Sequence, residues 1–229
     1  MRIDILTLFP KMFEGVLGES IIKRAQNKGK VSIEVHNLRD WSKDKHKKVD
    51  DKPFGGGPGM VIKSQPLFDA IDDLKSSSSR VVLLTPQGKT LDQAIARKLS
   101  KFKHLILVCG HYEGIDERFR KKAVTEEISL GDFILTGGEI PAIALIDCIV
   151  RLIPGVVGDK SSLEFESFTS GLLEYPQYTR PAVYRGLKVP EILLSGDHKR
   201  IEQWRKAMAL KRTRRKRPDM FRRYNDKER

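Results

Sequence analysis

Short apolar segments that alternate with amphipathic ones constrain the fold of this chain more than any other feature. Residues 81–84 and 105–108 are uninterrupted apolar runs, and residues 2–9 and 31–35 carry apolar side chains in partly alternating runs. Strands that are apolar on both sides are typical of parallel sheets covered on both faces. The pattern therefore predicts one α/β domain, built around a parallel sheet, over residues 1–157.

Helices are expected between these strands. Residues 11–27, 64–74 and 91–99 are the candidate segments, and the last two carry apolar side chains on one helical face. Thr90 and Gln93 have the spacing of a capping box, which predicts that the third helix begins there. In a sheet of this kind, ligands bind at the carboxyl ends of the strands.

Glycines follow apolar residues in three segments, 83–88, 108–114 and 134–139, each interpreted as a strand end and its loop. Glycine permits tight turns and close approach of the backbone to a ligand. Three such loops at one edge of a sheet indicate a site for a flat or extended small molecule. The loops lack the Walker and dinucleotide glycine patterns, which disfavours a nucleoside triphosphate or NAD.

Positive charge is concentrated at the end of the sequence. Residues 198–229 hold fourteen Lys or Arg against four Asp or Glu, a surplus of ten within the net charge of +13. Such a surplus repels itself and favours a polyanionic partner, most commonly nucleic acid. Ile201, Trp204 and Met208 lie at core spacing there, which predicts a small basic helical segment after a polar stretch that begins near residue 158.

Composition also excludes several classes. The sequence has no apolar stretch of membrane-spanning length, and Asp4 lies where a signal peptide needs its apolar run, so a cytoplasmic protein is expected. Cys109 and Cys148 have no second cysteine at metal-ligand spacing and are expected to be buried apolar residues. His111-x-Glu113 is similar to part of a zinc deaminase site, but no Pro-Cys-x-x-Cys completes it.

Five motifs, in one order along nearly the whole chain, resemble those of the bacterial tRNA (guanine-N1)-methyltransferases. They are DDKPFGGGPGM at 50–60, CGxYEGIDER at 109–118, GDxxLxGGE at 131–139, YTRP at 178–181 and LSGxH at 194–198. The resemblance implies methyl transfer from S-adenosylmethionine to N1 of the guanosine at tRNA position 37, next to the anticodon. It also implies a homodimer whose active sites lie at the subunit interface.

The resemblance further implies a fold that composition does not reveal. This is the SPOUT methyltransferase fold, an α/β parallel sheet with a deep trefoil knot, followed by a small C-terminal helical domain. The expected boundaries are residues 1–157 for the knotted domain that binds S-adenosylmethionine, 158–175 for a flexible linker, and 176–229 for a basic tRNA-binding domain. Knots are otherwise rare in proteins.

Site residues follow from the same motifs. Cofactor contacts are expected from three loops, at Leu84, Thr85, Pro86, Gly110, Tyr112, Glu113, Gly114, Ser129, Leu130, Gly131, Asp132, Phe133, Ile134, Leu135, Gly137 and Gly138. Substrate contacts are expected at Asp50, Gly57, Pro58, Gly59, Arg180 and His198. His111 stands where the family often has Arg. The family also implies Mg2+ during catalysis, without a recognisable protein metal site in this sequence.

The proposed chemistry requires a base and a cation. Guanine N1 carries a proton at neutral pH, so a base must remove it while a donor stabilises charge on O6. The resemblance assigns the cation to Arg151 and the base to Glu166, where the family usually has Asp. The alternatives for Glu166 are that Glu164 is the base, or that Glu166 is structural. The alternative for Arg151 is a charge that complements the helix dipole.

Two other functions stay open from the sequence. One is a related knotted enzyme that methylates ribose 2′-hydroxyls or ribosomal RNA, which would not need a base matched to guanine N1. The other is a basic RNA-binding protein that has lost catalysis, against which the intact glycine loops argue. Methyl transfer that depends on Glu166 would distinguish a guanine-N1 methyltransferase from the first alternative. Binding of S-adenosylmethionine would distinguish it from the second.

Replacing Glu166 with Gln should slow single-turnover methylation of tRNA at neutral pH by about 100-fold or more, because an amide cannot accept the N1 proton. Glu164→Gln, two residues away, is the matched control and should retain the wild-type rate. Near-normal methylation by Glu166→Gln would remove Glu166 from the role of base.

Overall fold

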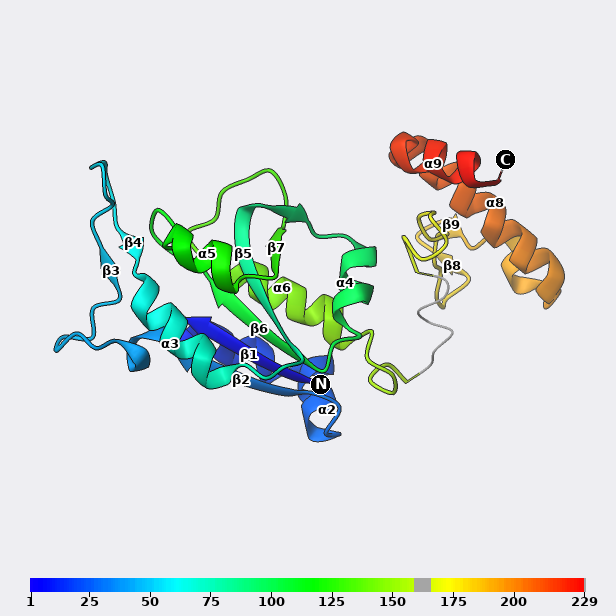
Figure 1. The fold of residues 1–229 in the computed structure, drawn as a ribbon. Helices are drawn as coiled ribbons and strands as arrows, with labels where there is room; N and C mark the ends of the chain where they lie inside the picture. The colour runs from blue at the N-terminus through cyan, green and yellow to red at the C-terminus, as the bar shows by residue number, and fades with distance from the viewer. Residues whose placement is uncertain (159–165, 229) are drawn as a thin grey trace. The chain divides into compact units, whose positions relative to one another are not determined.

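The computed structural model describes residues 1–158 and 166–228, and the chain forms two compact units with the boundary after Gly158. The first unit is built on a five-stranded sheet with the order β2-β1-β6-β5-β7, in which all neighbouring strands are parallel (Figure 1). The strands are β1 (Arg2–Thr7), β2 (Ser32–Asn37), β5 (Ser79–Thr90), β6 (His104–Cys109) and β7 (Glu126–Ser129). The predicted parallel sheet is thus confirmed.

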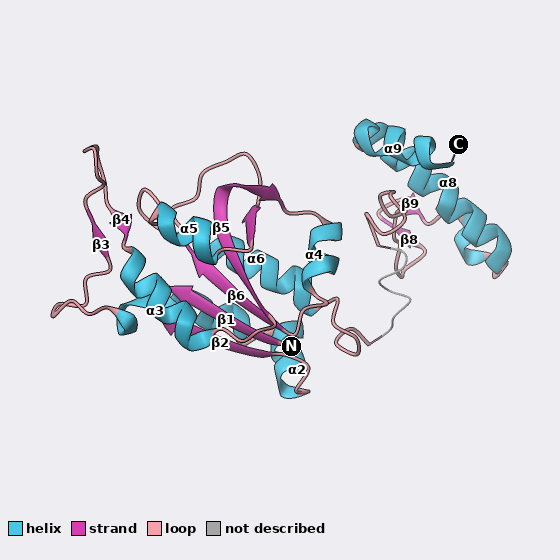
Figure 2. Cartoon of the chain, viewed as in Figure 1, coloured by secondary structure: helices cyan, strands magenta, loops and turns pink. Residues whose placement is uncertain are grey.

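Helices cover both faces of this sheet (Figure 2). One buried cluster joins the sheet to α2 (Ser20–Asn27), α4 (Gln93–Leu99) and α6 (Glu139–Val150), and the other joins it to α3 (Ser64–Leu74) and α5 (Glu117–Ala123). Successive residues of β5 alternate between the clusters, with Val82 and Leu84 in the first and Val81 and Leu83 in the second. Because side chains alternate along a strand, a wholly apolar strand fills both cores.

Smaller elements complete the first unit. They are the 3-10 helices η1 (Pro10–Phe13) and η2 (Leu38–Trp41), the short helix α1 (Glu14–Leu17), and an antiparallel pair of strands, β3 (Asp50–Asp51) and β4 (Val61–Ile62). The single helix expected over residues 11–27 is wrong, since η1, α1 and α2 share that range. Gly18 ends α1 and Glu19 has an extended backbone, with φ −129° and ψ 164°, which interrupts the helical hydrogen bonds.

Two further expectations about local structure are corrected. Thr90 does not cap α4, because it pairs with Ser129 in the sheet, and the side chain of Asp92 instead accepts a hydrogen bond from the Ile95 N–H at 2.8 Å. The strand end expected at Ile134 and Leu135 is wrong: these residues lie in a loop, where Ile134 is 81% exposed. The strand before this loop is β7, at the edge of the sheet. Only Ile128 and Ser129 of β7 are buried, so its composition gives little strand signal.

The cysteines differ in their surroundings. Cys109 is buried at the end of β6, as predicted. Cys148 is only half-buried, because it lies on α6 away from the face that carries Ala142, Leu145 and Ile149 into the core.

Over residues 166–228, the second unit contains two α-helices and a small antiparallel pair of strands. Its elements are β8 (Val183–Tyr184), β9 (Leu187–Lys188), the 3-10 helix η3 (Glu191–Leu194), α8 (His198–Lys216) and α9 (Pro218–Glu228). The Leu173 N–H donates to Thr213 Oγ1 at 2.8 Å, and Arg212 donates to the carbonyl of Glu174 at 3.1 Å. Leu173 and Glu174 of the expected linker are therefore bound to α8, while residues 159–165 lie outside the described residues.

Candidate functional site

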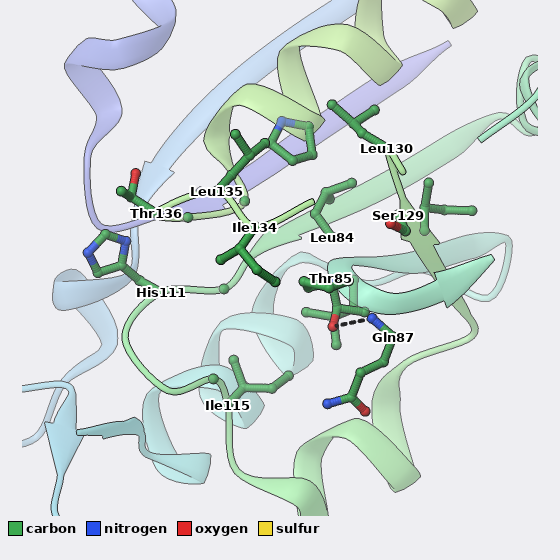
Figure 3. A pocket seen from close by; sticks show the side chains of 18 of the residues that line it. Leu84, Thr85, Gln87, His111, Ile115, Ser129, Leu130, Ile134, Leu135 and Thr136 are labelled. Carbon is green, nitrogen blue, oxygen red and sulfur yellow. Dashed lines mark hydrogen bonds between the residues drawn. The ribbon is translucent and has the colours of Figure 1, made fainter. Parts of the chain in front are cut away.

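A cavity of about 480 Å3 lies at the carboxyl ends of β5, β6 and β7 (Figure 3). Three loops surround it, contributed by residues 84–87, 110–115 and 129–138. Its volume is within the range of small-molecule sites in proteins. It occupies the edge of the sheet at which the sequence predicts ligand chemistry.

The cavity collects most residues that the sequence assigns to the cofactor. Fifteen of those sixteen line it, and Asp132 does not. Lining residues that sequence reasoning did not assign to the cofactor are Leu83, Gln87, His111, Ile115, Glu117, Arg120, Ile128, Thr136 and Pro141. Most of them directly adjoin the assigned residues, so proximity in the sequence was the signal that could have found them.

The first loop forms because β5 bulges and then rejoins the sheet. Ile128 of β7 pairs with both Leu84 and Lys89, so the residues between them leave the ladder. A Cβ at Gly88 would lie 2.4 Å from the backbone carbonyl carbon of Glu127, which leaves no room for a side chain. Glycine therefore allows β5 to return to its neighbour and complete one wall of the cavity.

The third loop crosses from the edge of the sheet toward its centre. It begins after β7, beyond β5, and yet the Gly138 N–H donates to the Gly110 carbonyl at the end of β6, at 2.8 Å. A Cβ at Gly138 would lie 2.7 Å from the Cα of Cys109. This close contact of two backbones closes the cavity and sets the start of α6.

His111 has an unpaired polar atom beside this contact. Its Nδ1 is, among the described residues, a buried side-chain nitrogen without a hydrogen-bond partner, and Phe9 and Tyr112 each pack with ring centroids 4.8 Å from the imidazole. A buried polar atom of this kind is costly unless a ligand or water satisfies it. His111 is therefore suited to contact a molecule in the cavity that it lines.

A buried carboxylate supports the same region. Glu139 is 2% exposed at the start of α6, and its Oε1 accepts a hydrogen bond from Thr7 Oγ1 at 2.7 Å. The carboxylate is favourably placed at a helix N-terminus. Burial, and to a smaller extent Glu139, raise the pKa of the Cys109 thiol, so Cys109 is a neutral packing residue and not a nucleophile.

The glycine-rich segment before β4 lies against the second loop. The Glu113 N–H donates to the Met60 carbonyl, and the Ile62 N–H donates to the Gly114 carbonyl, both at 3.0 Å. Gly59 has φ +77°, and a Cβ there would lie 2.3 Å from a carboxylate oxygen of Glu113. The structure thus brings Gly59, with Gly57 and Pro58 next to it in the chain, beside the cavity, whereas Asp50 lies on β3 opposite Ile62.

The remaining assigned residues lie elsewhere in the two units. Arg151 is the half-buried C-cap of α6, where it also complements the negative end of the helix dipole. Glu166 is half-buried, and Arg180 and His198 are exposed, all three in the second unit. His198 is the first residue of α8.

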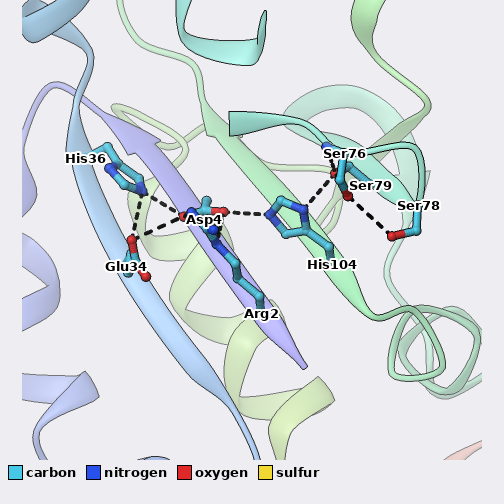
Figure 4. A network of polar contacts seen from close by, with 8 residues as sticks. All are labelled: Arg2, Asp4, Glu34, His36, Ser76, Ser78, Ser79 and His104. Carbon is cyan, nitrogen blue, oxygen red and sulfur yellow. Dashed lines mark hydrogen bonds and ion pairs between the residues drawn. The ribbon is translucent and has the colours of Figure 1, made fainter. Parts of the chain in front are cut away.

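One group of described side chains has the spacing of a metal site, at the opposite end of the sheet (Figure 4). Asp4, fully buried on β1, accepts hydrogen bonds from His36 at 2.7 Å, from His104 at 2.6 Å and from Arg2 at 3.0 Å. With Glu34 and His36 it forms the candidate group. Arg2 already neutralises this carboxylate, so the group does not suit a divalent cation and is a structural network.

The burial of Asp4 raises its pKa, but the hydrogen bonds from His36, Arg2 and His104 outweigh burial and lower that pKa to about 2. The network continues to Ser79, whose hydroxyl lies 2.7 Å from His104 Nδ1. It therefore ties the first strand to the start of β5, through His104 of β6.

Within residues 1–158 and 166–228, no helix is long and apolar enough to cross a membrane.

The fold defines a class of α/β proteins that bind a ligand at the carboxyl edge of a parallel sheet, and in this chain a strongly basic sequence follows that domain. Residues 1–223 match the protein family described as tRNA (Guanine-1)-methyltransferase TrmD. The chain belongs to this family.

Similar proteins agree with this assignment. A tRNA (guanine-N(1)-)-methyltransferase of Halalkalibacterium halodurans is 57% identical over 224 residues, which cover 96% of this chain and 91% of that protein. Proteins of the same description from Staphylococcus epidermidis and Dictyoglomus turgidum are 56% and 58% identical. They cover 98% and 96% of this chain, and 92% and 90% of their own lengths.

Replacing Gly138 with Ala should lower the free energy of unfolding by about 1–3 kcal/mol, because the added methyl meets fixed backbone rather than a flexible side chain. It should also weaken binding of S-adenosylmethionine, the cofactor that the sequence motifs imply. Chemical denaturation and calorimetric titration measure the two effects. Gly15→Ala, with nothing within 4 Å of the new Cβ, is the control. Wild-type stability and cofactor affinity in Gly138→Ala would contradict the tight contact.

Replacing Asp4 with Asn should lower the free energy of unfolding at pH 7 by about 3 kcal/mol, since it leaves Arg2 and two imidazoles without their buried carboxylate. Asp72→Asn, which removes an exposed pair with Lys75, should change it by less than about 0.5 kcal/mol.

The effect of Asp4 should depend on pH. The pKa of Asp4 is about 2 in the folded state against an ordinary 3.8, so its stabilising charge is present above about pH 4 and is lost as the pH falls toward 2. The difference between wild type and Asp4→Asn in urea denaturation should shrink over that range. A constant difference would show that the charge of Asp4 is not responsible.

Proposed function

We propose that this chain transfers a methyl group from S-adenosylmethionine to N1 of the guanosine at position 37 of tRNA, in the cytoplasm. The observation that carries the proposal is the cavity, in which three motif loops meet in a chain of the tRNA (guanine-1)-methyltransferase family. Its mixed lining suits a cofactor that has an adenine ring, a ribose and an amino-acid part.

The residues present fit S-adenosylmethionine. Leu84, Pro86 and Ile128 supply apolar surface for the adenine, and the backbone of the loops supplies polar groups for the ribose and the amino-acid part. His111 Nδ1 supplies a polar contact that is unpaired in the protein alone. When bound, S-adenosylmethionine supplies an electrophilic methyl group on a sulfonium.

The path of the third loop supports a trefoil knot as part of this proposal. Residues 129–138 pass from the sheet edge over the end of β5 to the end of β6, and α6 follows directly. A knotted path would hold the loop against the cofactor without a lid that must fold anew in each cycle.

The proposed chemistry assigns one proton transfer and one electrostatic role to the protein. Glu166 accepts the proton from guanine N1, so that the ring nitrogen presents its electron pair to the methyl group. Arg151 stabilises the negative charge that develops on O6. The Asp4 group does not supply a site for the Mg2+ that the family resemblance implies during catalysis, because Arg2, His36 and His104 already satisfy its carboxylate.

The second unit supplies the proposed contact with tRNA. Its sequence from 198 onward carries the surplus of ten positive charges, and most side chains of α8 are exposed. Cations at this density bind phosphates, and the affinity should fall steeply with salt. Arg180 and His198 are proposed to contact the RNA, together with Asp50 and the segment from Gly57 to Gly59 of the first unit.

An exposed apolar surface supports the proposed homodimer. Phe133 is 54% exposed and Ile134 81% exposed in the third loop, Ile140 is 49% exposed on α6, and Met12 and Val16 are 43% and 41% exposed in the preceding short helices. Exposed apolar side chains mark an association surface where they lie together, and we propose that these five do. A dimer formed there would join the two cofactor sites to the interface, as the sequence motifs imply.

Labelled S-adenosylmethionine, given with a transcript that has guanosines at positions 36 and 37, should yield 1-methylguanosine. A transcript with adenosine at position 37 should accept no methyl group, because adenine N1 carries no proton for the base to remove and adenine has no O6. Methylation of ribose, or of ribosomal RNA instead of the transcript, would redirect the function to the related class of enzyme.

Replacing Ile134 with Glu should convert the dimer to monomer in analytical ultracentrifugation and lower methyl transfer by at least about tenfold, because a charge would be buried in an apolar interface. Leu187→Glu, at a 76% exposed apolar residue of the second unit, is the control and should leave the dimer intact. A dimeric and fully active Ile134→Glu variant would locate the interface elsewhere.

A further inference from the structure

A second cavity, of about 390 Å3, lies within the second unit. It is formed between residues 175–182, the end of η3 and one side of α8. Three aromatic residues, Tyr175, Tyr178 and Trp204, line it together with two arginines, Arg180 and Arg205. Neither cofactor binding nor the proposed methyl transfer uses this cavity.

The aromatic rings form an open wedge. The ring centroids of Tyr178 and Trp204 are 6.5 Å apart, and the ring planes are inclined by 51°. Tyr178 is 50% exposed, so part of this residue is accessible to a ligand. Such a wedge admits a planar ring that stacks on one aromatic side chain while its edge meets the other.

The charges around the wedge are positive. The guanidinium of Arg205 lies over the Tyr175 ring, 4.9 Å from its centroid, and both arginines are exposed. Among the described residues that line the cavity, none is acidic. The remaining lining is polar or aliphatic, with Leu193 and Ile201 among the aliphatic residues.

Aromatic faces combined with cations, and without carboxylates, match an unpaired nucleotide better than a peptide or an apolar side chain. Proteins that hold single-stranded nucleic acid stack its bases on aromatic rings and bind its phosphates with arginines. The surplus of ten positive charges in residues 198–229 adds to the attraction of a polyanion.

We infer that this cavity binds one unpaired nucleobase of the RNA substrate, stacked on Tyr178 with its edge toward Trp204, and with Arg180 and Arg205 at the adjoining phosphates. The inference rests on the proposed function, because it takes tRNA as the ligand. It adds a stacking site for a base other than the methylated guanine, in the unit that does not contain the cofactor cavity. That site would fix the position of the anticodon loop.

The chain has two tryptophans, which makes Trp204 a direct reporter. Trp41 lies in η2 of the first unit, so a Trp41→Phe variant of the full chain leaves Trp204 as the sole tryptophan. Titration with a synthetic anticodon stem-loop RNA should quench its fluorescence, with a midpoint equal to the dissociation constant measured by anisotropy of labelled RNA. A fully base-paired RNA hairpin with a minimal loop should bind through its phosphates without that quenching.

Substitution of Tyr178 separates stacking from charge. Tyr178→Leu should weaken binding of the stem-loop by about tenfold, whereas Tyr178→Phe, which keeps the ring, should bind like wild type. The dependence of affinity on salt should be unchanged in Tyr178→Leu but reduced in Arg180→Gln, since only the latter removes a phosphate contact. Circular dichroism and thermal denaturation show whether each variant is folded.

Stem-loops with one abasic nucleotide identify the base. One loop position should weaken binding to the wild type about as much as Tyr178→Leu does, and should cause no further loss in Tyr178→Leu, because both changes remove the same contact. Full binding by a folded Tyr178→Leu variant, or additive losses at every abasic position, would overturn the inference.

Trp204 fluorescence that changes with protein concentration, and not with RNA, would also overturn it and would assign the cavity to a second copy of the chain. Methyl transfer to the intact transcript by the wild type distinguishes these outcomes from failure of the proposed function. If methyl transfer occurs without base stacking here, only the further inference fails.

Discussion

The contact between Gly138 and the end of β6 is the constraint on which the rest of the site depends. The third loop starts at the far edge of the sheet and must cross β5, and its backbone then lies so close to Cys109 and Gly110 that no side chain fits at Gly138. The same contact closes the cavity and begins α6. It also sets Gly137 against the His111 ring, on the side of the unpaired Nδ1 atom.

The two ends of the sheet differ in whether their buried polar groups have hydrogen-bond partners. At the amino ends of the strands, the buried carboxylate of Asp4 is saturated by Arg2, His36 and His104, which makes it a stabilising element with no capacity left for a ligand. At the carboxyl ends, Glu139 is paired with Thr7 but the His111 nitrogen is unpaired. Since an unpaired buried polar atom is stabilised by a ligand, the difference explains why the proposed chemistry belongs to one end only.

The proposed recognition of cofactor and RNA is divided between the two units by physical type. The first holds a cavity made mostly of backbone and apolar side chains, which suits a small molecule of fixed shape. The second combines exposed cations with aromatic rings, which suits a flexible polyanion whose bases are accessible. Joining them in one chain would bring methyl donor and RNA together, as expected of a member of the tRNA (guanine-1)-methyltransferase family.

The sequence by itself determined the parallel sheet with two covered faces and helix α3 over residues 64–74, because apolar periodicity is a local signal. The family resemblance also gave sixteen residues proposed to contact the cofactor, and fifteen of them line the cavity. Only the tertiary structure decided that Glu126–Ser129 is the edge strand, that Asp92 rather than Thr90 caps α4, and that His111 Nδ1 lacks a partner. An edge strand needs few buried residues, and a cap is fixed by where strand pairing ends. Whether a buried nitrogen has a hydrogen-bond partner depends on atoms that come together from distant segments. The edge strand, the helix cap and the unpaired nitrogen therefore cannot be predicted from the local pattern of residues.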